Sequence, residues 1–321
     1  MTTIVIVGTV AGMRTRLVAT LTALTLVAAG CGSGASGSSD GRPQVVTAFY
    51  PLQFLTQRIG GDQVQISDLT KPGAEPHDLE LNPRQVGAIS DADLVVYLRG
   101  FQPAVDQAVG QEAGDKAFDV GGTVELLAAS ESHDHGPGEE EHAEQAAGGK
   151  DPHVWLDPIR FATISDKLGE RLAQADPAHA ADHRARAAAL HGELDQLDRE
   201  FAAALKTCQR REIVTSHTAF AYLAARYDLH EVGITGISPE AEASPQRLAG
   251  VAREAKETGA TTIFFETLVS PKVAETIAKE VGARTAVLDP IEGRTDPNAD
   301  YFSMMRSNLT ALTQALGCSH D

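Results

Sequence analysis

Three histidines stand beside turn-forming or strand-like residues and offer metal-ligand chemistry. They are His77 in KPGAEPHDLE, His153 in DPHVWLDP and His217 in EIVTSHTAF. A carboxylate, Asp289, ends a further apolar run in TAVLDPIEG. Neutral imidazoles and a carboxylate are ligands that zinc takes in proteins, and they can come from distant parts of a chain. The sequence therefore predicts one transition-metal site made of these four side chains.

A second group of histidines lies in the acidic stretch SHDHGPGEEEHAEQ. It contains His133, His135 and His142, and the segment from residue 130 to residue 150 shows no apolar period. Such a composition predicts disorder. We interpret the three histidines as an auxiliary loop that captures zinc weakly and passes it to the main site. The alternative is a solvated acidic linker that only tolerates histidines.

Length and composition limit the class of protein. A chain of 321 residues is long enough for two lobes with separate cores, and 42% apolar with 22% charged residues is typical of a soluble globular protein. The net charge of −17 disfavours a nucleic-acid partner, because phosphate binding needs a basic surface.

The N-terminal residues have the layout of an export signal. Two arginines precede an apolar run, residues 17–29, which is too short to span a membrane and stops just before Cys31. We therefore expect a signal peptide over residues 1–31, lipidation at Cys31, and a flexible Gly/Ser tether over residues 32–43. Two alternatives stay open: a start at Met13, and a cleaved signal that leaves the cysteine unmodified.

Two further cysteines, Cys208 and Cys318, follow the leader. In an exported chain such an even pair favours a disulfide. Two separate buried thiols are the alternative. Metal ligation by these cysteines is disfavoured, because the sequence has no CxxC spacing.

Strand and helix patterns alternate from residue 44 to the C-terminus. Strands are predicted at residues 44–49, 64–70, 94–98, 116–120, 212–216, 229–235, 261–266 and 285–288. Helices are predicted from Pro51, Pro83, Pro158, Pro245 and Pro271, over residues 177–206 and 218–229, and near the C-terminus. This α/β alternation implies a mostly parallel sheet flanked by helices in each of two lobes, residues 44–176 and 207–321, joined by the long helix 177–206.

The candidate ligands take positions where such sheets bind ligands, beyond the carboxyl ends of the strands. His217 and Asp289 directly follow predicted strands, His77 lies in the loop after another strand, and His153 leads into a predicted helix. We therefore expect all four to face a cleft between the lobes, where they would complete a tetrahedral zinc shell.

The motifs KPGAEPHDLE, DPHVWLDP, VTSHTAFAYLAARYDL, FFETLVSP and VLDPIEG jointly resemble those of the zinc-specific solute-binding proteins of bacterial ABC importers, the cluster A-I family. The resemblance covers the leader and the chain from about residue 44 to the C-terminus. It implies two Rossmann-like lobes, a rigid connecting helix and one metal in the cleft, with ligands at His77, His153, His217 and Asp289. The manganese branch of that family carries glutamate at the position of His217, so histidine favours zinc.

The fourth ligand is the position at which this family varies most. We expect Asp289 there, with Glu75, Glu266 or water as alternatives; for Glu266 an ion-pair or capping role near the site is preferred. Trp155 is expected to pack beside the site. The remaining histidines are expected at the surface without a metal: His179, His183, His191, His230 and His320.

The resemblance implies a receptor that binds zinc outside the cytoplasm and delivers it to an ABC permease. We expect a monomer held by its lipid on the outer face of the cytoplasmic membrane, at the cell surface or in the periplasm. HExxH and GxxxxGK[ST] are absent from the sequence, which disfavours a metalloprotease or an ATPase. Hydrolysis would become conceivable if water replaced Asp289. A manganese or iron receptor of the same family stays open, as does a surface adhesion lipoprotein with a structural metal.

Overall fold

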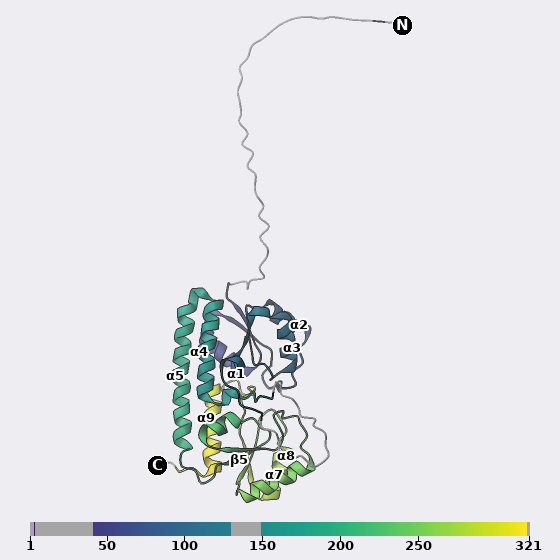
Figure 1. The fold of residues 1–321 in the computed structure, drawn as a ribbon, viewed down its shortest axis with the longest axis vertical. Helices are drawn as coiled ribbons and strands as arrows, with labels where there is room; N and C mark the ends of the chain where they lie inside the picture. The colour runs from purple at the N-terminus through teal and green to yellow at the C-terminus, as the bar shows by residue number, and fades with distance from the viewer. Residues whose placement is uncertain (1–2, 4–40, 130–148, 320–321) are drawn as a thin grey trace. The chain divides into compact units, whose positions relative to one another are not determined.

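Two four-stranded parallel sheets form the framework of the computed structural model, which describes Thr3, residues 41–129 and residues 149–319 (Figure 1). Several sequence predictions fall outside these described residues. They are the signal peptide, lipidation at Cys31, most of the tether, the loop histidines His133, His135 and His142, and His320.

The first lobe is built on the sheet of strands β1 to β4, with the spatial order β2-β1-β3-β4. All its pairings are parallel, and Val46 lies between Ser67 on one side and Val95 on the other. Its strands are β1 (Gln44–Thr47), β2 (Gln65–Asp68), β3 (Leu94–Tyr97) and β4 (Ala117–Asp119). The connecting helices are α1 (Tyr50–Gly60), α2 (Pro83–Asp91) and α3 (Pro103–Glu112).

The second lobe repeats this order with strands β5 to β8, arranged as β6-β5-β7-β8 and again entirely parallel. Its strands are β5 (Glu212–Thr215), β6 (His230–Gly233), β7 (Thr262–Phe265) and β8 (Arg284–Val287). Its helices are α6 (Ala221–Tyr227), α7 (Pro245–Glu257), α8 (Lys272–Val281) and α9 (Tyr301–Leu316). The predicted fold class, two α/β lobes with mostly parallel sheets and a long helix, is therefore confirmed.

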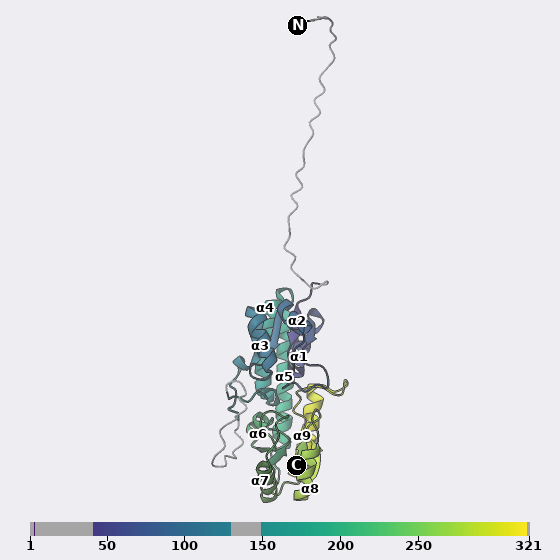
Figure 2. The same cartoon turned by 90° about the vertical axis from the view of Figure 1, so that its right-hand side faces the viewer.

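Two long helices, α4 (Pro158–Ala175) and α5 (Ala180–Ala204), connect the lobes. They lie side by side, and α5 also packs against α1 of the first lobe and α9 of the second (Figures 1 and 2). Their close approach depends on Gly169, because a Cβ there would stand 2.6 Å from the Cβ of Ala187. The helix predicted over residues 177–206 is thus present, although a short 3-10 turn occupies its first three residues.

Local signals explain most helix starts. Proline stands at the first turn of five helices, where its missing N–H costs nothing. Asn82 and Asp300 complete capping boxes at the starts of α2 and α9, and Asp157 caps α4. Helix α3 was not among the predicted helices, although Pro103 offers the same starting signal.

The predicted disulfide is present: Cys208 and Cys318 are bonded, which ties the segment before β5 to the end of α9. One expectation about the histidines is wrong. His183 is not at the surface but fully buried, because its ring lies between the carbonyl oxygen of Ile59 at 3.2 Å and the carboxylate of Asp176 at 3.0 Å.

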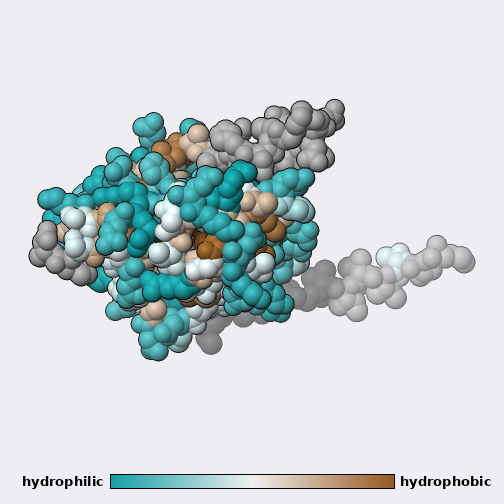
Figure 3. Space-filling model, turned by 90° about the horizontal axis from the view of Figure 1, so that it is seen from below, coloured by the Kyte–Doolittle hydropathy of each residue, from teal (hydrophilic) through white to brown (hydrophobic). Residues whose placement is uncertain are grey.

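Figure 3 shows one face of the molecule, on which hydrophilic residues predominate and hydrophobic ones appear in small separate groups. Val273 and Val287 are large hydrophobic residues with more than a third of their surface exposed. Within the described residues, no helix combines the length and the apolar composition that crossing a membrane requires.

Candidate metal centre

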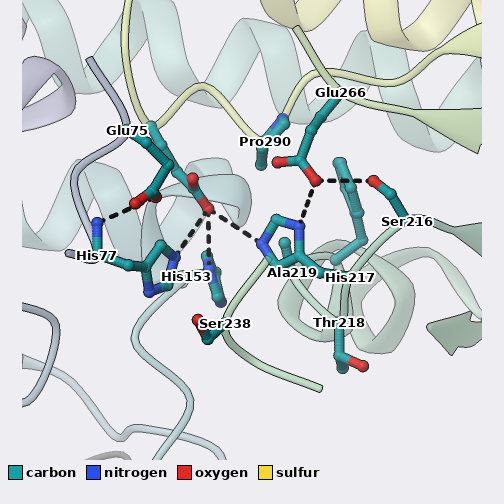
Figure 4. Close-up of polar contacts among 12 residues, drawn as sticks. Glu75, His77, His153, Ser216, His217, Thr218, Ala219, Ser238, Glu266 and Pro290 are labelled. Carbon is teal, nitrogen blue, oxygen red and sulfur yellow. Dashed lines mark hydrogen bonds and ion pairs between the residues drawn. The ribbon is translucent and has the colours of Figure 1, made fainter. Parts of the chain in front are cut away.

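Four side chains from four separate segments converge between the lobes: His77, His153, His217 and Glu292. The three histidines are labelled in Figure 4. One ligand atom from each lies within 4.8 Å of the others. All four residues are buried, and His77, at 8% exposed, is the least so. The structure thus brings together the three histidines that the sequence singled out, and adds a carboxylate that it did not.

The distances within this cluster suit a small tetrahedral ion. The Nε2 atoms of His153 and His217 each lie 3.1 Å from Oε1 of Glu292, and Nε2 of His77 lies 3.3 Å from it. Ligand atoms bound to one tetrahedral zinc at its usual bond lengths stand about 3.3 Å apart. The three distances to the Glu292 oxygen therefore match those around one such ion, and the remaining pairs of ligand atoms lie within 4.8 Å.

His77 is held by the turn that precedes it. The carboxylate of Glu75 accepts hydrogen bonds from the backbone N–H groups of His77, at 3.0 Å, and Asp78, at 3.2 Å. The ring of Phe101 lies edge-on to the imidazole, with 4.6 Å between centroids. Glu75, one of the residues considered for the fourth ligand, thus caps this turn.

His153 is oriented through its other ring nitrogen. Oδ1 of Asp151 lies 2.8 Å from Nδ1 of His153. The same oxygen accepts a hydrogen bond from the backbone N–H of His153. A carboxylate on Nδ1 leaves Nε2 free to bind a metal, which is the usual arrangement around zinc. The ring of Trp155 packs against the imidazole at 5.3 Å, which confirms the expectation that this indole lies beside the site.

His217 has a matching partner in the second lobe. Oε1 of Glu266 lies 2.8 Å from Nδ1 of His217 and also accepts a hydrogen bond from Ser216 at 2.7 Å. The preferred interpretation of Glu266, an ion-pair partner beside the site, is confirmed. Each of these two histidines therefore has one nitrogen on a carboxylate and the other in the cluster.

The ionisable groups of the cluster shift one another's pKa values. Burial lowers the pKa of His153, but Asp151 and Glu292 outweigh that effect and raise it to about 9. Burial likewise opposes protonation of His217, and Glu266 with Glu292 raises its pKa well above the ordinary value. Burial alone would raise the pKa of Glu292, yet the surrounding imidazoles hold it well below its usual range. In the metal-free centre, the raised pKa values of His153 and His217 favour protonated imidazoles, and a bound cation must displace these protons.

The carboxylate at the cluster belongs to Glu292 and not to Asp289, the residue expected from sequence. The oxygens of Asp289 accept the N–H of Ile291 at 2.8 Å and the hydroxyl of Thr267 at 3.0 Å. The chain then reverses at Ile291, whose φ is 60°, and this turn brings Glu292 to the imidazoles. The second oxygen of Glu292 is buried and has no hydrogen-bond partner among the described residues. An available signal was the second acidic residue of VLDPIEG.

Comparisons with known proteins agree with this geometry. The chain matches the family model described as "Zinc-uptake complex component A periplasmic" over residues 45–315. It is 38% identical over 288 residues to the zinc-binding protein AdcA of Streptococcus pyogenes, covering 85% of this chain and 56% of that protein. The chain thus spans little more than half the length of that curated relative.

A relative of similar length also matches. The high-affinity zinc uptake system protein ZnuA of Bacillus subtilis is 34% identical over 310 residues, which cover 91% of this chain and 94% of that protein.

Two solved structures resemble this fold. The zinc-bound ZnuA-like domain of Streptococcus pneumoniae AdcA aligns with a TM-score of 0.71 at 33% identity, over 86% of this chain and 99% of that one. The laminin-binding protein of Streptococcus agalactiae, described as bifunctional with adhesin and metal-transporting activity, aligns with a TM-score of 0.75 at 31% identity over the same shares.

Proposed function

The chain belongs to the family of zinc-uptake complex component A proteins, and we propose that it is an extracytoplasmic receptor that binds Zn²⁺ and delivers it to an ABC permease. The observation that carries the proposal is the buried group of three imidazoles and one carboxylate drawn from both lobes. Zinc is the cargo, and its proposed ligands are His77, His153, His217 and Glu292.

The composition of the group favours zinc over manganese. Imidazole suits zinc, whereas manganese is better served by carboxylates, carbonyls and water. Three of the four donors are imidazoles, and two of these are backed by a carboxylate on Nδ1. Such partners raise the basicity of a ligand and fix its orientation.

The number of protein ligands also favours a binding protein over an enzyme. A catalytic zinc keeps one position open for water, whereas a closed shell of four protein ligands leaves none. Since Glu292 already fills the fourth position, hydrolysis at this centre would require that carboxylate to leave. A receptor, by contrast, needs only to bind and release the ion.

The remaining parts of the proposal concern delivery. We propose that lipidation at Cys31 holds a monomer on the outer face of the cytoplasmic membrane, and that the loop histidines His133, His135 and His142 gather zinc for the main site. Deleting residues 131–149 should leave one tight zinc site intact. Loss of tight binding in that variant would move the site to the loop.

The direct test is a calorimetric titration of the metal-stripped protein with zinc, with and without excess manganese. We expect one tight zinc site that manganese does not displace. Displacement by manganese would favour the manganese or iron receptor. An adhesion protein with a structural metal would instead be unfolded, by circular dichroism, once the metal is stripped.

Selectivity should depend on His217. The substitution His217→Glu adds a second carboxylate and should shift preference towards manganese. Competition between the two metals, followed by calorimetry, measures the shift. Unchanged selectivity would show that this position does not set it.

Acid should weaken binding, because protons compete with zinc for the imidazoles. His153, with its pKa raised to about 9, is already protonated at neutral pH in the metal-free protein, so affinity should fall steadily from about pH 9 downward. Zinc titrations at a series of pH values measure this slope. An affinity that is independent of pH between about 5 and 9 would contradict a shell of three imidazoles.

A further inference from the structure

The geometry points to a clamp, made of Asp289 and Asn308, that sets the zinc affinity of the site without touching the ion. We infer that these two positioning residues hold the chain reversal at Ile291, and that this reversal aims the carboxylate of Glu292 at the three imidazoles. The inference rests on the proposed function in one respect, namely that Glu292 is a zinc ligand.

Asp289 closes the turn from inside. Its Oδ1 accepts the N–H of Ile291, two residues on, at 2.8 Å, and its Oδ2 accepts the hydroxyl of Thr267 at 3.0 Å. Both carboxylate oxygens are therefore occupied by neutral donors, and neither points into the metal cluster. The carboxylate acts as a cap for the turn that follows β8.

Asn308, on helix α9, holds the same residue from outside. Its Oδ1 accepts the N–H of Asp289 at 2.8 Å, and its Nδ2 donates to the carbonyl oxygen of Asp289 at 2.6 Å. This amide is 2% exposed, so both bonds lie away from solvent. A buried amide that satisfies both polar groups of one backbone residue fixes that residue firmly.

The first lobe adds a third contact. The indole N–H of Trp155 donates to the carbonyl oxygen of Pro290 at 2.7 Å, and Tyr301, at the start of α9, donates to the carbonyl oxygen of Trp155 at 2.6 Å. Trp155 also packs against His153, one of the three imidazoles. The turn is therefore held by groups from both lobes, and one of them contacts the centre directly.

The backbone conformation at Ile291 is intrinsically unfavourable. Ile291 is β-branched, yet its φ is 60°, in the left-handed region that such residues rarely adopt. Its side chain is fully buried, which prevents the peptide from rotating without unpacking. A strained residue directly before a ligand persists only where its surroundings over-determine it. Loss of the clamp should let Ile291 relax and withdraw Glu292 from the imidazoles.

The decisive experiment compares two substitutions at Asp289. Asparagine keeps an acceptor for the N–H of Ile291 and can donate to the hydroxyl of Thr267, whereas alanine removes both contacts. For Asp289→Ala we expect zinc affinity to fall on the order of 10–100-fold, as for other residues that support a ligand. For Asp289→Asn we expect near wild-type affinity, because the turn remains capped although the charge is gone.

Two readouts separate positioning from other roles. Zinc affinity is measured by competition with a chelator, and the visible spectrum of the Co²⁺-loaded protein reports coordination geometry. Asp289→Ala should change this spectrum, while Asp289→Asn should restore it. If both variants lose zinc equally, Asp289 is a ligand and the clamp is wrong. If Asp289→Ala lowers thermal stability but leaves affinity and spectrum unchanged, the role is structural only, and the clamp is again wrong.

The chain supplies a matched control. Asp119, at the end of β4, makes the equivalent capping contact in the first lobe: it accepts the N–H of Gly121, also two residues on, at 3.0 Å. Asp119→Ala removes the same kind of contact and should leave zinc affinity and the Co²⁺ spectrum unchanged. If Asp289→Ala does not fold, Asn308→Ala tests the outer half of the clamp with the same readouts and the same expected loss.

The variant Glu292→Gln distinguishes two kinds of failure: a wrong inference about the clamp, and a wrong proposal for the zinc site. If this variant binds zinc like the wild type, Glu292 is not a ligand and the proposed site fails with the clamp. If Glu292→Gln weakens binding while Asp289→Ala and Asn308→Ala do not, the site stands and only the clamp is refuted.

Discussion

The two lobes share one sheet plan but use the chain after the fourth strand differently. In each lobe the strand order places the first strand beside the second and third, with the fourth at an edge. After β4, Asp119 caps the 3-10 helix Val120–Thr123 by accepting the N–H of Gly121. After β8, Asp289 caps a turn at Ile291 that leads to Glu292. The two lobes thus share an aspartate cap after the fourth strand, and only the second cap is followed by a residue of the histidine cluster.

The difference lies in what surrounds the two turns. At Gly121 an added Cβ would come closest to Cδ1 of Leu98, at 2.8 Å, the end of a flexible side chain, and the backbone has no positive φ. At Ile291 a full side chain is buried and the backbone bears the strain instead. Only the second turn therefore holds a strained residue, and that residue stands directly before the carboxylate of the cluster.

The lobes also differ in how their sheets join the rest of the molecule. The first lobe belongs to one continuous hydrophobic core that includes helices α4, α5 and α9. The second sheet contributes to two cores, because alternate residues of a strand face opposite sides. Ile213 and Phe264 face the main core, whereas Val214 and Ile263 face a smaller cluster under α7 and α8 that is rich in alanine. The outer half of the second lobe should therefore be the least stable part of the described structure.

The largest expected effect concerns the disulfide, which has no counterpart in the described part of the first lobe. Cys208 and Cys318 are 110 residues apart, and closing so long a loop in the unfolded chain stabilises the fold by about 5 kcal/mol. Thermal unfolding of a double variant, Cys208→Ala with Cys318→Ala, should show this loss. A melting temperature equal to that of the wild type would mean that the second lobe needs no such link.

A smaller effect is expected from core substitutions on the two faces of the second sheet, which should differ in how the loss of stability is observed. Both Ile213 and Ile263 are fully buried. Replacing either with alanine should therefore lower the stability of the core in which it packs by about 2–5 kcal/mol. For Ile213→Ala we expect the loss in global denaturant unfolding, because the main core spans both lobes. For Ile263→Ala we expect faster hydrogen exchange in α7 and α8 with a smaller global loss. Equal global losses without local opening would show that the two cores unfold as one.

The smallest effect concerns a feature that the lobes share. In each, a threonine of the first strand donates to a carboxylate of the second: Thr47 to Asp68 at 2.8 Å, and Thr215 to Glu231 at 3.0 Å. Burial is the main cause that raises the pKa of both carboxyls to about 7.

The sign of the resulting pH dependence can be worked out for Asp68. Because its pKa is higher in the folded state than the ordinary 3.8, the folded protein binds the proton more tightly. Its contribution to stability is fully present below about pH 4 and is lost as the pH rises through about 7. Asp68→Asn should therefore raise the free energy of unfolding by about 1–2 kcal/mol above pH 7 and flatten its pH dependence. Urea denaturation at pH 5 and pH 8 checks this. An equal effect at both pH values would refute a buried, titrating carboxyl.

Most of the fold could be predicted from the sequence, because its signals are local. Short runs of mostly apolar residues mark most of the strands, and proline and capping residues mark helix starts. The even pair Cys208 and Cys318 indicates a disulfide. The three histidines were recognisable for the same reason, since each stands in a distinctive turn or at the end of a strand. Helix α3 carries the same proline signal, so it too could have been predicted.

Burial was harder to predict from a local pattern. His183 looks like an exposed helical residue in its own stretch of sequence. It is buried because Ile59 and Asp176, the first of them 124 residues away, supply acceptors for both of its ring nitrogens.

What the sequence determined by itself was the framework and the three imidazoles. The identity of the carboxylate was decided by tertiary structure. Asp289 and Glu292 stand three residues apart in one motif, and no local pattern tells which of them turns inward. Asn308, on a helix that packs against this turn, and Trp155, from the other lobe, hold it in the strained form that selects Glu292. Contacts between segments distant in sequence cannot be read from the residues beside the site, and here they accompany the placement of Glu292 beside the three imidazoles.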